Sequence, residues 1–179
     1  MEKNIQKVLI SEEQLQTRIR QLAQTISEEY AGKTPVFVGV LKGVVMFYSA
    51  FIKHVTIPCE MEFMKISSYE GTDSTGVTRM SLDVSDNIEG RHVVILEDIF
   101  DTGKSLDFTY RHLLSKNPAS LKIITLLDKP TRRNPDVTLQ ADYVGFEIPN
   151  EFVVGFGLDY NELYRNLPYI GIMKPEVYM

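Results

Sequence analysis

Cysteine is nearly missing from this sequence of 179 residues, since Cys59 is the only one, and tryptophan is absent. A single cysteine excludes an intrachain disulfide and a cysteine-rich metal site. We expect Cys59 to be a buried, small apolar side chain. The histidines are also few: His54, His92 and His112 stand far apart and have the spacing of neither a zinc site nor a Ser-His-Asp triad. The sequence therefore indicates none of the common thiol, zinc or serine-hydrolase chemistries.

Long hydrophobic runs and an excess of positive charge are missing as well. No stretch is long enough to span a bilayer, and the first residues lack the apolar run of a signal peptide. The net charge of −5 argues against charge-driven binding to nucleic acid or to anionic membranes. We therefore expect a cytoplasmic protein with small-molecule partners. An anionic substrate would need a local group of cations or a bridging metal ion.

Helix and strand signals alternate along the chain. Ser11-Glu12-Glu13-Gln14 has capping-box spacing, apolar residues then recur every three or four positions, and Gly32 can close the helix. Short apolar runs predict strands at 36–41, 62–66, 92–96, 121–127 and 143–148, with helices at 44–52 and 104–115 between them. This alternation predicts an α/β fold with a mostly parallel twisted sheet flanked by helices. Ligands of such sheets bind beyond the carboxyl ends of the strands.

One polar segment interrupts this alternation. Residues 67–76 are rich in serine, threonine and glycine, and they are too many for a tight hairpin. Long loops of this kind inside a compact domain are usually lids or disordered connectors.

The most informative segment joins a buried strand to a helix. The strand ends in two consecutive carboxylates, Glu97 and Asp98, and Thr102-Gly103-Lys104-Ser105 follow shortly after. Backbone amides from Asp101 to Ser105, together with two hydroxyls at a helix N-terminus, can cradle one phosphate monoester. The carboxylates suit the vicinal hydroxyls of a ribose, either directly or through a divalent ion. Phosphate on one side and a diol on the other describe ribose 5-phosphate.

Two other interpretations of this segment are weaker. An acidic cluster that stabilises the helix N-terminus explains Asp101 and Thr102, but it does not explain two carboxylates at the end of an apolar strand, where desolvation is costly. The segment also resembles the end of a nucleotide-binding P-loop, yet Asp98 stands where that motif requires its first glycine.

With these residues in place, the segment resembles the phosphoribosyl diphosphate (PRPP) motif of type I phosphoribosyltransferases, specifically of their hypoxanthine-guanine branch. The resemblance covers nearly the whole chain, because other motifs of that branch occur in order. They are Leu41-Lys42-Gly43 as a pyrophosphate loop, 67–76 as a catalytic lid, Lys129 as the contact of the purine 6-oxo group, Phe152 to Gly155 and Leu158 to Tyr160 as a hood, and Arg165 as a pyrophosphate contact.

The resemblance assigns a role to each of these residues. It implies PRPP or ribose-phosphate binding by Glu97, Asp98, Asp101, Thr102, Gly103, Lys104 and Ser105, with Asp101 as the catalytic residue that accepts the proton of purine N7. It implies pyrophosphate binding by Lys42, Gly43 and Arg165, purine binding by Lys129, Phe152, Val153 and Asp159, and a lid carrying Ser68 and Tyr69. The implied cofactor is Mg²⁺, with Asp159, Glu97 and Asp98 as its candidate ligands.

Simpler interpretations of single residues stay open at this point. Lys42 and Lys129 can be solvated lysines in a turn and at a strand end, Phe152 can be a core residue, and Arg165 can merely pair with a nearby acid. Asp159 is harder to explain structurally, because an acid within an apolar run needs a partner.

The resemblance implies magnesium-dependent transfer of the 5-phosphoribosyl group from PRPP to hypoxanthine, and to guanine, giving IMP or GMP and pyrophosphate in purine salvage. It also implies one domain over residues 1–179, with a core at about 30–145 and a hood from about 1–15 and 146–179. We expect a homodimer or homotetramer. Three alternatives remain: a transferase for xanthine, adenine or uracil, an RNA-binding regulator on the same fold, and a P-loop kinase.

Overall fold

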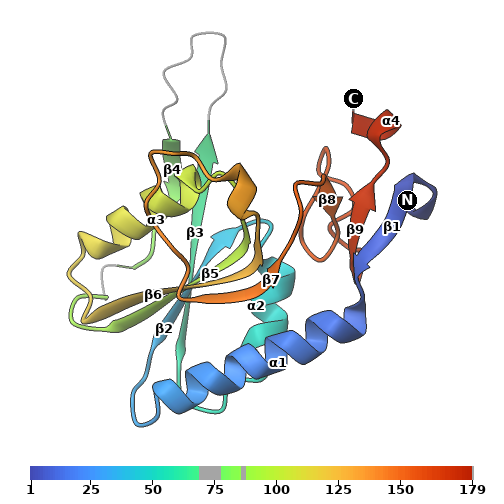
Figure 1. Cartoon of the computed structure of the whole chain (residues 1–179). Helices are drawn as coiled ribbons and strands as arrows, with labels where there is room; N and C mark the ends of the chain where they lie inside the picture. Colours follow the sequence, from blue (N-terminus) through green and yellow to red (C-terminus); the bar gives the residue numbers. More distant parts are fainter. Residues whose placement is uncertain (69–77, 86–87, 179) are drawn as a thin grey trace.

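A six-stranded sheet in the order β4-β3-β2-β5-β6-β7 forms the centre of the protein (Figure 1). This computed structural model describes residues 1–68, 78–85 and 88–178. All neighbouring strands are parallel except β3 and β4, which confirms the predicted α/β fold with a mostly parallel sheet. The strands are β2 (Val36–Leu41), β3 (Glu60–Ser68), β4 (Thr78–Leu82), β5 (His92–Phe100), β6 (Ser120–Asp128) and β7 (Tyr143–Glu147).

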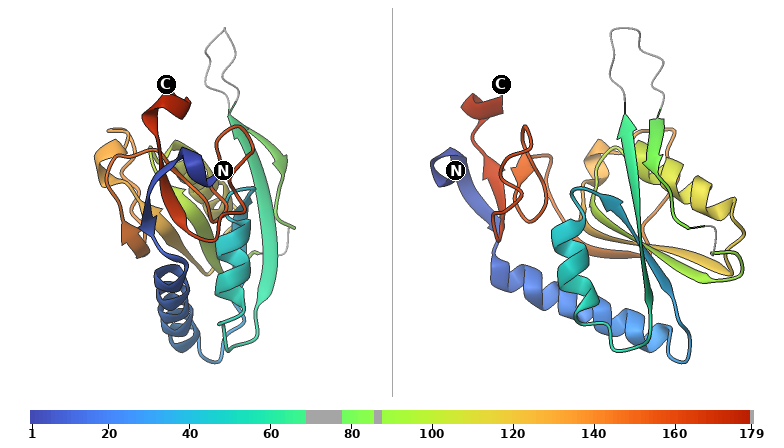
Figure 2. Two further views of the ribbon diagram at one scale, coloured as in Figure 1. Left: turned by 90° about the vertical axis from the view of Figure 1, so that its right-hand side faces the viewer. Right: turned by 180° about the vertical axis from the view of Figure 1, so that it is seen from behind.

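Helices cover both faces of this sheet, as Figure 2 shows. Helices α1 (Glu12–Glu29) and α2 (Val45–Ile52) pack on one face, and α3 (Lys104–Leu114) packs against β5 and β6 on the other. The central strands are buried on both faces because alternate side chains enter different cores: Leu96 packs toward α1 and α2, and Ile95 packs toward α3. Within the described ranges, no helix is long and apolar enough to cross a membrane.

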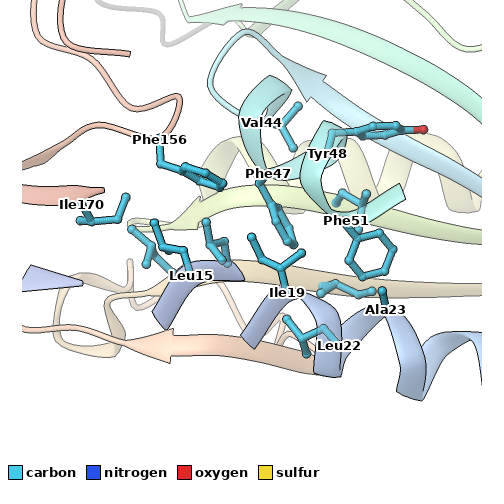
Figure 3. Packing of buried hydrophobic residues seen from close by; sticks show 14 of the residues in the cluster. Leu15, Ile19, Leu22, Ala23, Val44, Phe47, Tyr48, Phe51, Phe156 and Ile170 are labelled. Carbon is cyan, nitrogen blue, oxygen red and sulfur yellow. The ribbon is translucent and has the colours of Figure 1, made fainter. Parts of the chain in front are cut away.

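The core between α1 and α2 is shown in Figure 3. Leu15 and Ile19 of α1 meet Phe47 of α2, and Phe156 from the C-terminal segment joins the same cluster. Helix α1 begins at the predicted capping box, in which the Gln14 N–H donates to Ser11 Oγ (3.2 Å) and the Ser11 N–H donates to Gln14 Oε1 (2.9 Å).

A second, three-stranded sheet contains both ends of the chain. Strand β9 (Ile170–Met173) pairs antiparallel with β1 (Ile5–Ile10) on one side and with β8 (Val153–Val154) on the other. The segments expected to form a hood supply these strands, while the division into core and hood stays a prediction. Three short helices complete the described structure: the 3-10 helices at Glu2–Asn4 and Pro130–Arg132 and the helix α4 (Pro175–Tyr178).

Two expectations from the sequence need correction. Strand β5 does not end at the acidic pair but continues to Phe100, because Ile99 and Phe100 still pair with Leu127 and Asp128 of β6. The acidic pair therefore lies within the strand rather than at its end. Cys59 is half-buried rather than fully buried, and it packs against the core beside α2.

Candidate active site

Two neighbouring pockets lie at the carboxyl ends of β5 and β6. The loop pocket, of about 220 Å³, is lined by residues 97–103, Ser105 and Leu106. The aromatic pocket, of about 380 Å³, is lined by Ile99, Asp101, Lys129, Arg132, Asn150, Glu151, Phe152, Val153, Leu158, Asp159 and Tyr178. Ile99 and Asp101 line both pockets, so a ligand can extend from one to the other past Asp101.

The loop pocket presents unused backbone donors. The amides from Thr102 to Ser105 donate to no backbone acceptor among the described residues, and they lead into the first turn of α3. Gly103, at φ +85°, makes this turn possible, and a β-carbon there would meet the ring of Phe100. Free N–H groups at a helix N-terminus form an anion-binding site.

Arg133 supports the loop from behind, a role that the sequence did not reveal. Its Nη1 donates to the carbonyl oxygen of Asp101 (2.7 Å), its Nη2 pairs with Asp128, and its guanidinium carbon lies 3.1 Å from the centre of the Phe100 ring. The Asn134 N–H also donates to the carbonyl of Thr102 (3.0 Å). These contacts fix the backbone whose amides face the pocket.

The two consecutive carboxylates, Glu97 and Asp98, both have a raised pKa. Glu97 is buried, and its Oε2 has no hydrogen-bond partner. Burial, and then the charge of Asp98, raise the pKa of Glu97 well above its usual value. Burial also raises the pKa of Asp98 to about 6, although the Ile99 N–H donates to its Oδ1 (2.8 Å). Such carboxylates are suited to accept hydrogen bonds from hydroxyls or to face a cation.

Lys129 provides the opposite charge in the aromatic pocket. It follows β6, its side chain is only 6% exposed, and burial lowers its pKa. In the described part of the chain its ammonium has no hydrogen-bond or ion-pair partner. Lys129 is therefore not the fully solvated lysine of the simpler interpretation, and its ammonium is available to a ligand in the aromatic pocket.

Aromatic rings form the other wall of this pocket. Phe152 is half-buried rather than part of the central core, and its ring stacks on that of Tyr178 (4.6 Å between centroids, 21° between planes). The ring of Tyr160 lies perpendicular to that of Phe152 (5.7 Å between centroids, 90° between planes). The sequence did not identify Tyr178, because a tyrosine near the C-terminus belongs to no recognisable motif.

A chain of ion pairs connects the remaining predicted residues. Lys42 Nζ lies 2.8 Å from Glu162 Oε2, which is also 3.4 Å from Arg165 Nη2. That same Nη2 lies 2.9 Å from Asp159 Oδ1, while Arg165 Nη1 donates to the Gly157 carbonyl (2.8 Å). Lys42, Gly43 and Arg165 line neither pocket, but this chain links Lys42 and Arg165 to the aromatic pocket through Asp159.

The backbone of the Lys42–Gly43 loop lies close to Asp98 and to Gly157. A β-carbon at Gly43 would overlap the carboxylate of Asp98, and one at Gly157 would overlap the carbonyl oxygen of Gly43. The Leu41–Lys42 peptide bond is cis. Glycine is needed at both positions because backbone and carboxylate occupy the space that a side chain would fill.

The roles predicted for Lys104, Ser68 and Tyr69 stay predictions. Lys104 is exposed and does not line the loop pocket, so its phosphate contact stays a prediction. Ser68 is the last residue of β3, and Tyr69 lies outside the described residues. The lid assignment therefore stays a prediction.

The acidic residues fit a divalent ion only in part. No group of three or more His, Cys, Asp or Glu side chains in the described ranges is arranged to hold a metal. The unpartnered Glu97 Oε2 and the adjacent Asp98 offer hard oxygen ligands, whereas both oxygens of Asp159 already accept from Arg165 and from the Glu162 N–H (2.9 Å). One or two carboxylates suit magnesium that takes its other ligands from water and substrate oxygens.

The chain is similar to known proteins over its whole length. The hypoxanthine-guanine phosphoribosyltransferase of Lactococcus lactis is 49% identical over 99% of this chain and 96% of its own length. A hypoxanthine phosphoribosyltransferase structure from Staphylococcus aureus, 48% identical, superimposes with a TM-score of 0.93 and covers 100% of this chain and 97% of that one. The bifunctional protein TilS/HprT of Listeria innocua is 51% identical over 99% of this chain, which spans only 27% of that protein.

The phosphoribosyl transferase domain family matches residues 10–161, a range that includes every lining residue of both pockets except Tyr178. Together with the full-length similarity to the L. lactis enzyme, this match shows that the chain belongs to the phosphoribosyltransferase family.

Proposed function

We propose that this protein transfers the 5-phosphoribosyl group of PRPP to hypoxanthine, and to guanine, releasing pyrophosphate and forming IMP or GMP in purine salvage. The observation that carries the proposal is the pair of adjoining pockets that share Asp101. One offers free backbone donors beside two carboxylates, and the other offers the mostly buried Lys129 beside an aromatic ring. A phosphorylated ribose fits the first, and a flat base with a carbonyl oxygen fits the second.

The loop pocket holds the ribose phosphate in this proposal. The amides from Thr102 to Ser105 and the hydroxyls of Thr102 and Ser105 receive the 5-phosphate, and Glu97 and Asp98 accept hydrogen bonds from the ribose hydroxyls. The same carboxylates lie close to the anomeric carbon, where positive charge develops as the bond to pyrophosphate breaks. Their negative charge favours this transition state.

The aromatic pocket holds the purine. Phe152 stacks on the base, Lys129 donates to the 6-oxo group, and the backbone at Val153 receives the 2-amino group of guanine. As purine N9 forms its bond to the anomeric carbon, Asp101 takes the proton from N7, for which its position between the pockets is suitable.

The pyrophosphate lies on the side of Lys42 and Arg165. Their charges balance the leaving group, and the Gly43 backbone permits its close approach. We include Mg²⁺ as the cofactor, with Glu97, Asp98 and Asp159 as the residues that would hold it. When bound, magnesium supplies a hard cation that neutralises pyrophosphate oxygens.

The proposal also includes a cytoplasmic location and assembly as a homodimer or homotetramer. The second point is supported by Val45 and Met46, which α2 leaves 44% and 37% exposed. Sedimentation of the purified protein measures the assembly directly.

The function is tested by incubating the protein with PRPP, Mg²⁺ and one base at a time, and then measuring nucleotide and pyrophosphate. We expect IMP from hypoxanthine and GMP from guanine, complete loss of turnover in EDTA, and recovery on adding magnesium. Nucleotide formation from adenine or uracil alone would favour one of the rival transferases. Absence of any nucleotide would refute the proposal.

A further inference from the structure

The carboxylate of Glu162 contacts Lys42 and Arg165, the two cations that bind pyrophosphate in the proposed function. Its Oε2 lies 2.8 Å from Lys42 Nζ and 3.4 Å from Arg165 Nη2. One oxygen therefore contacts both cations, as an oxygen of a pyrophosphate group would. Neither Lys42 nor Arg165 has another ion-pair partner in the described ranges apart from Asp159, which pairs with Arg165.

The backbone at Glu162 is unusual for this residue type. Asn161 and Glu162 are the central residues of a two-residue turn between Tyr160 and Leu163, and both have positive φ (+50° and +64°). Turns of this kind prefer glycine at the second central position, because a side chain there costs free energy. The Glu162 N–H donates to Asp159 Oδ2 (2.9 Å), which holds the turn in place. A glutamate at a position that favours glycine indicates that its side chain has a use.

The contact is also easily broken. The Glu162 side chain is 65% exposed and that of Lys42 is 53% exposed, and exposed ion pairs contribute little because water competes with them. The hydrogen bond from Lys42 lowers the pKa of Glu162, so the carboxylate is charged when the pair forms. A multiply charged pyrophosphate group can therefore displace it.

We propose that Glu162 is an internal competitor for the pyrophosphate group. Its carboxylate neutralises Lys42 and Arg165 in the free protein, moves away when the pyrophosphate group of PRPP arrives, and returns as the product pyrophosphate leaves. This inference rests on the proposed function, since that function places pyrophosphate at Lys42. The competitor keeps the affinity for pyrophosphate low and favours its release.

The test is the binding of inorganic pyrophosphate and of PRPP, measured by calorimetry at fixed Mg²⁺ concentration. Glu162→Gln removes the charge but keeps the size of the side chain. We expect it to bind pyrophosphate about 2–5-fold more tightly than the wild type, which is the range expected for loss of an exposed ion pair.

Glu60→Gln is the matched control. Glu60 is also an exposed glutamate in an ion pair, 2.8 Å from Arg91 Nη2, and its loss changes the net charge by the same amount. Equal tightening by Glu60→Gln would mean that net charge alone is responsible, and this would overturn the inference. Glu162→Gly is a second variant that suits the positive φ of this position, so it should keep its thermal stability and bind pyrophosphate as tightly as Glu162→Gln.

A double-mutant cycle separates direct competition from a long-range effect. In a Lys42→Ala background, Glu162→Gln should give much less tightening, and an undiminished gain would contradict competition at Lys42. Unchanged or weaker binding by Glu162→Gln in the otherwise intact protein would overturn the inference and leave the proposed function standing. A wild-type protein that binds neither pyrophosphate nor PRPP would refute both.

Discussion

The loop pocket and the aromatic pocket are built in opposite ways. Every polar group of the loop pocket comes from one continuous segment, 97–105, which is fixed between two strands and a helix. The aromatic pocket takes its walls from segments that are distant in the sequence, around Asp101, Lys129, Phe152 and Tyr178. Each pocket also contains one buried ionisable residue: Glu97, whose Oε2 has no hydrogen-bond partner, and Lys129, for which no ion pair is formed within the described ranges. The first pocket is therefore specified by a motif and the second by the tertiary fold.

The largest effect is expected in the aromatic pocket, in the choice of base. The Lys129 ammonium only donates hydrogen bonds, so it suits a 6-oxo group and faces another donor in the 6-amino group of adenine. We expect kcat/KM for adenine to be lower than that for hypoxanthine by up to about 10⁴-fold. Lys129→Ala should reduce use of hypoxanthine and guanine while PRPP binding stays nearly unchanged. Measuring kcat/KM for the four common purines in both proteins tests this, and a preference for adenine would contradict it.

Asp101 lies where the two pockets meet, and its substitution tests whether they act together. Asp101→Asn keeps the shape of the side chain and removes the proton acceptor, so kcat should fall by about 10²–10⁴-fold with PRPP affinity largely kept. Asp107→Asn is the control, because Asp107 pairs with Arg111 at 2.8 Å on the outer side of α3 and should leave kcat unchanged. If Asp101→Asn keeps kcat within a few-fold, Asp101 is only a residue of the phosphate loop.

The different construction of the two pockets explains what the sequence revealed. The strand order could not be predicted from the sequence. Caps and apolar periodicity are local signals, so the sequence predicted several elements nearly to the residue: the helix cap at Ser11, the strands 36–41 and 143–147, and the start of α3. The strands β1, β4, β8 and β9 were not predicted. Strand β1 exposes half of its side chains, and β8 has only two residues.

The same distinction holds within the site. Residues 97–105 could be assigned from the segment itself, whereas Tyr178, Arg132 and Glu151 enter the aromatic pocket only through tertiary packing. Arg133 was missed for a related reason: it supports the loop through a backbone carbonyl and an aromatic ring, and neither contact leaves a pattern in the sequence.

Arg133 offers a way to loosen the loop pocket without touching its ligand-binding groups. Arg133→Met keeps the apolar stem but removes the hydrogen bond to the Asp101 carbonyl and the pair with Asp128. We expect stability to fall by about 2 kcal/mol and KM for PRPP to rise about 10-fold, because the loop is no longer held in its binding conformation. Thermal unfolding and initial rates measure the two effects. Arg111→Met, which removes an exposed pair, should change stability by less than about 0.5 kcal/mol.

The smallest expected effect concerns the stability cost of the acidic pair in the free protein. Glu97 and Asp98 both have a pKa raised by burial, Asp98 to about 6. The folded protein therefore binds more protons than the unfolded chain between the two sets of pKa values, so its stability falls as pH rises from about 4 through 6. Because Glu97 lacks a partner for Oε2, Glu97→Gln should raise stability at pH 7.5 by about 1 kcal/mol, a modest gain since the new amide is also buried. The variant should also flatten the fall in stability between pH 5 and pH 7.5, and its ribose site should weaken.

Thermal unfolding of the protein in EDTA, at both pH values, measures this effect without bound ligand. Glu147→Gln, at an exposed position at the end of β7, should change neither value and serves as the control. A stability that rises between pH 5 and pH 7.5, or a destabilised Glu97→Gln variant, would mean that the acidic pair stabilises the fold. In that case the comparison between the pockets would change, because the acidic pair would be part of the scaffold while Lys129 would still lack an ion-pair partner among the described residues.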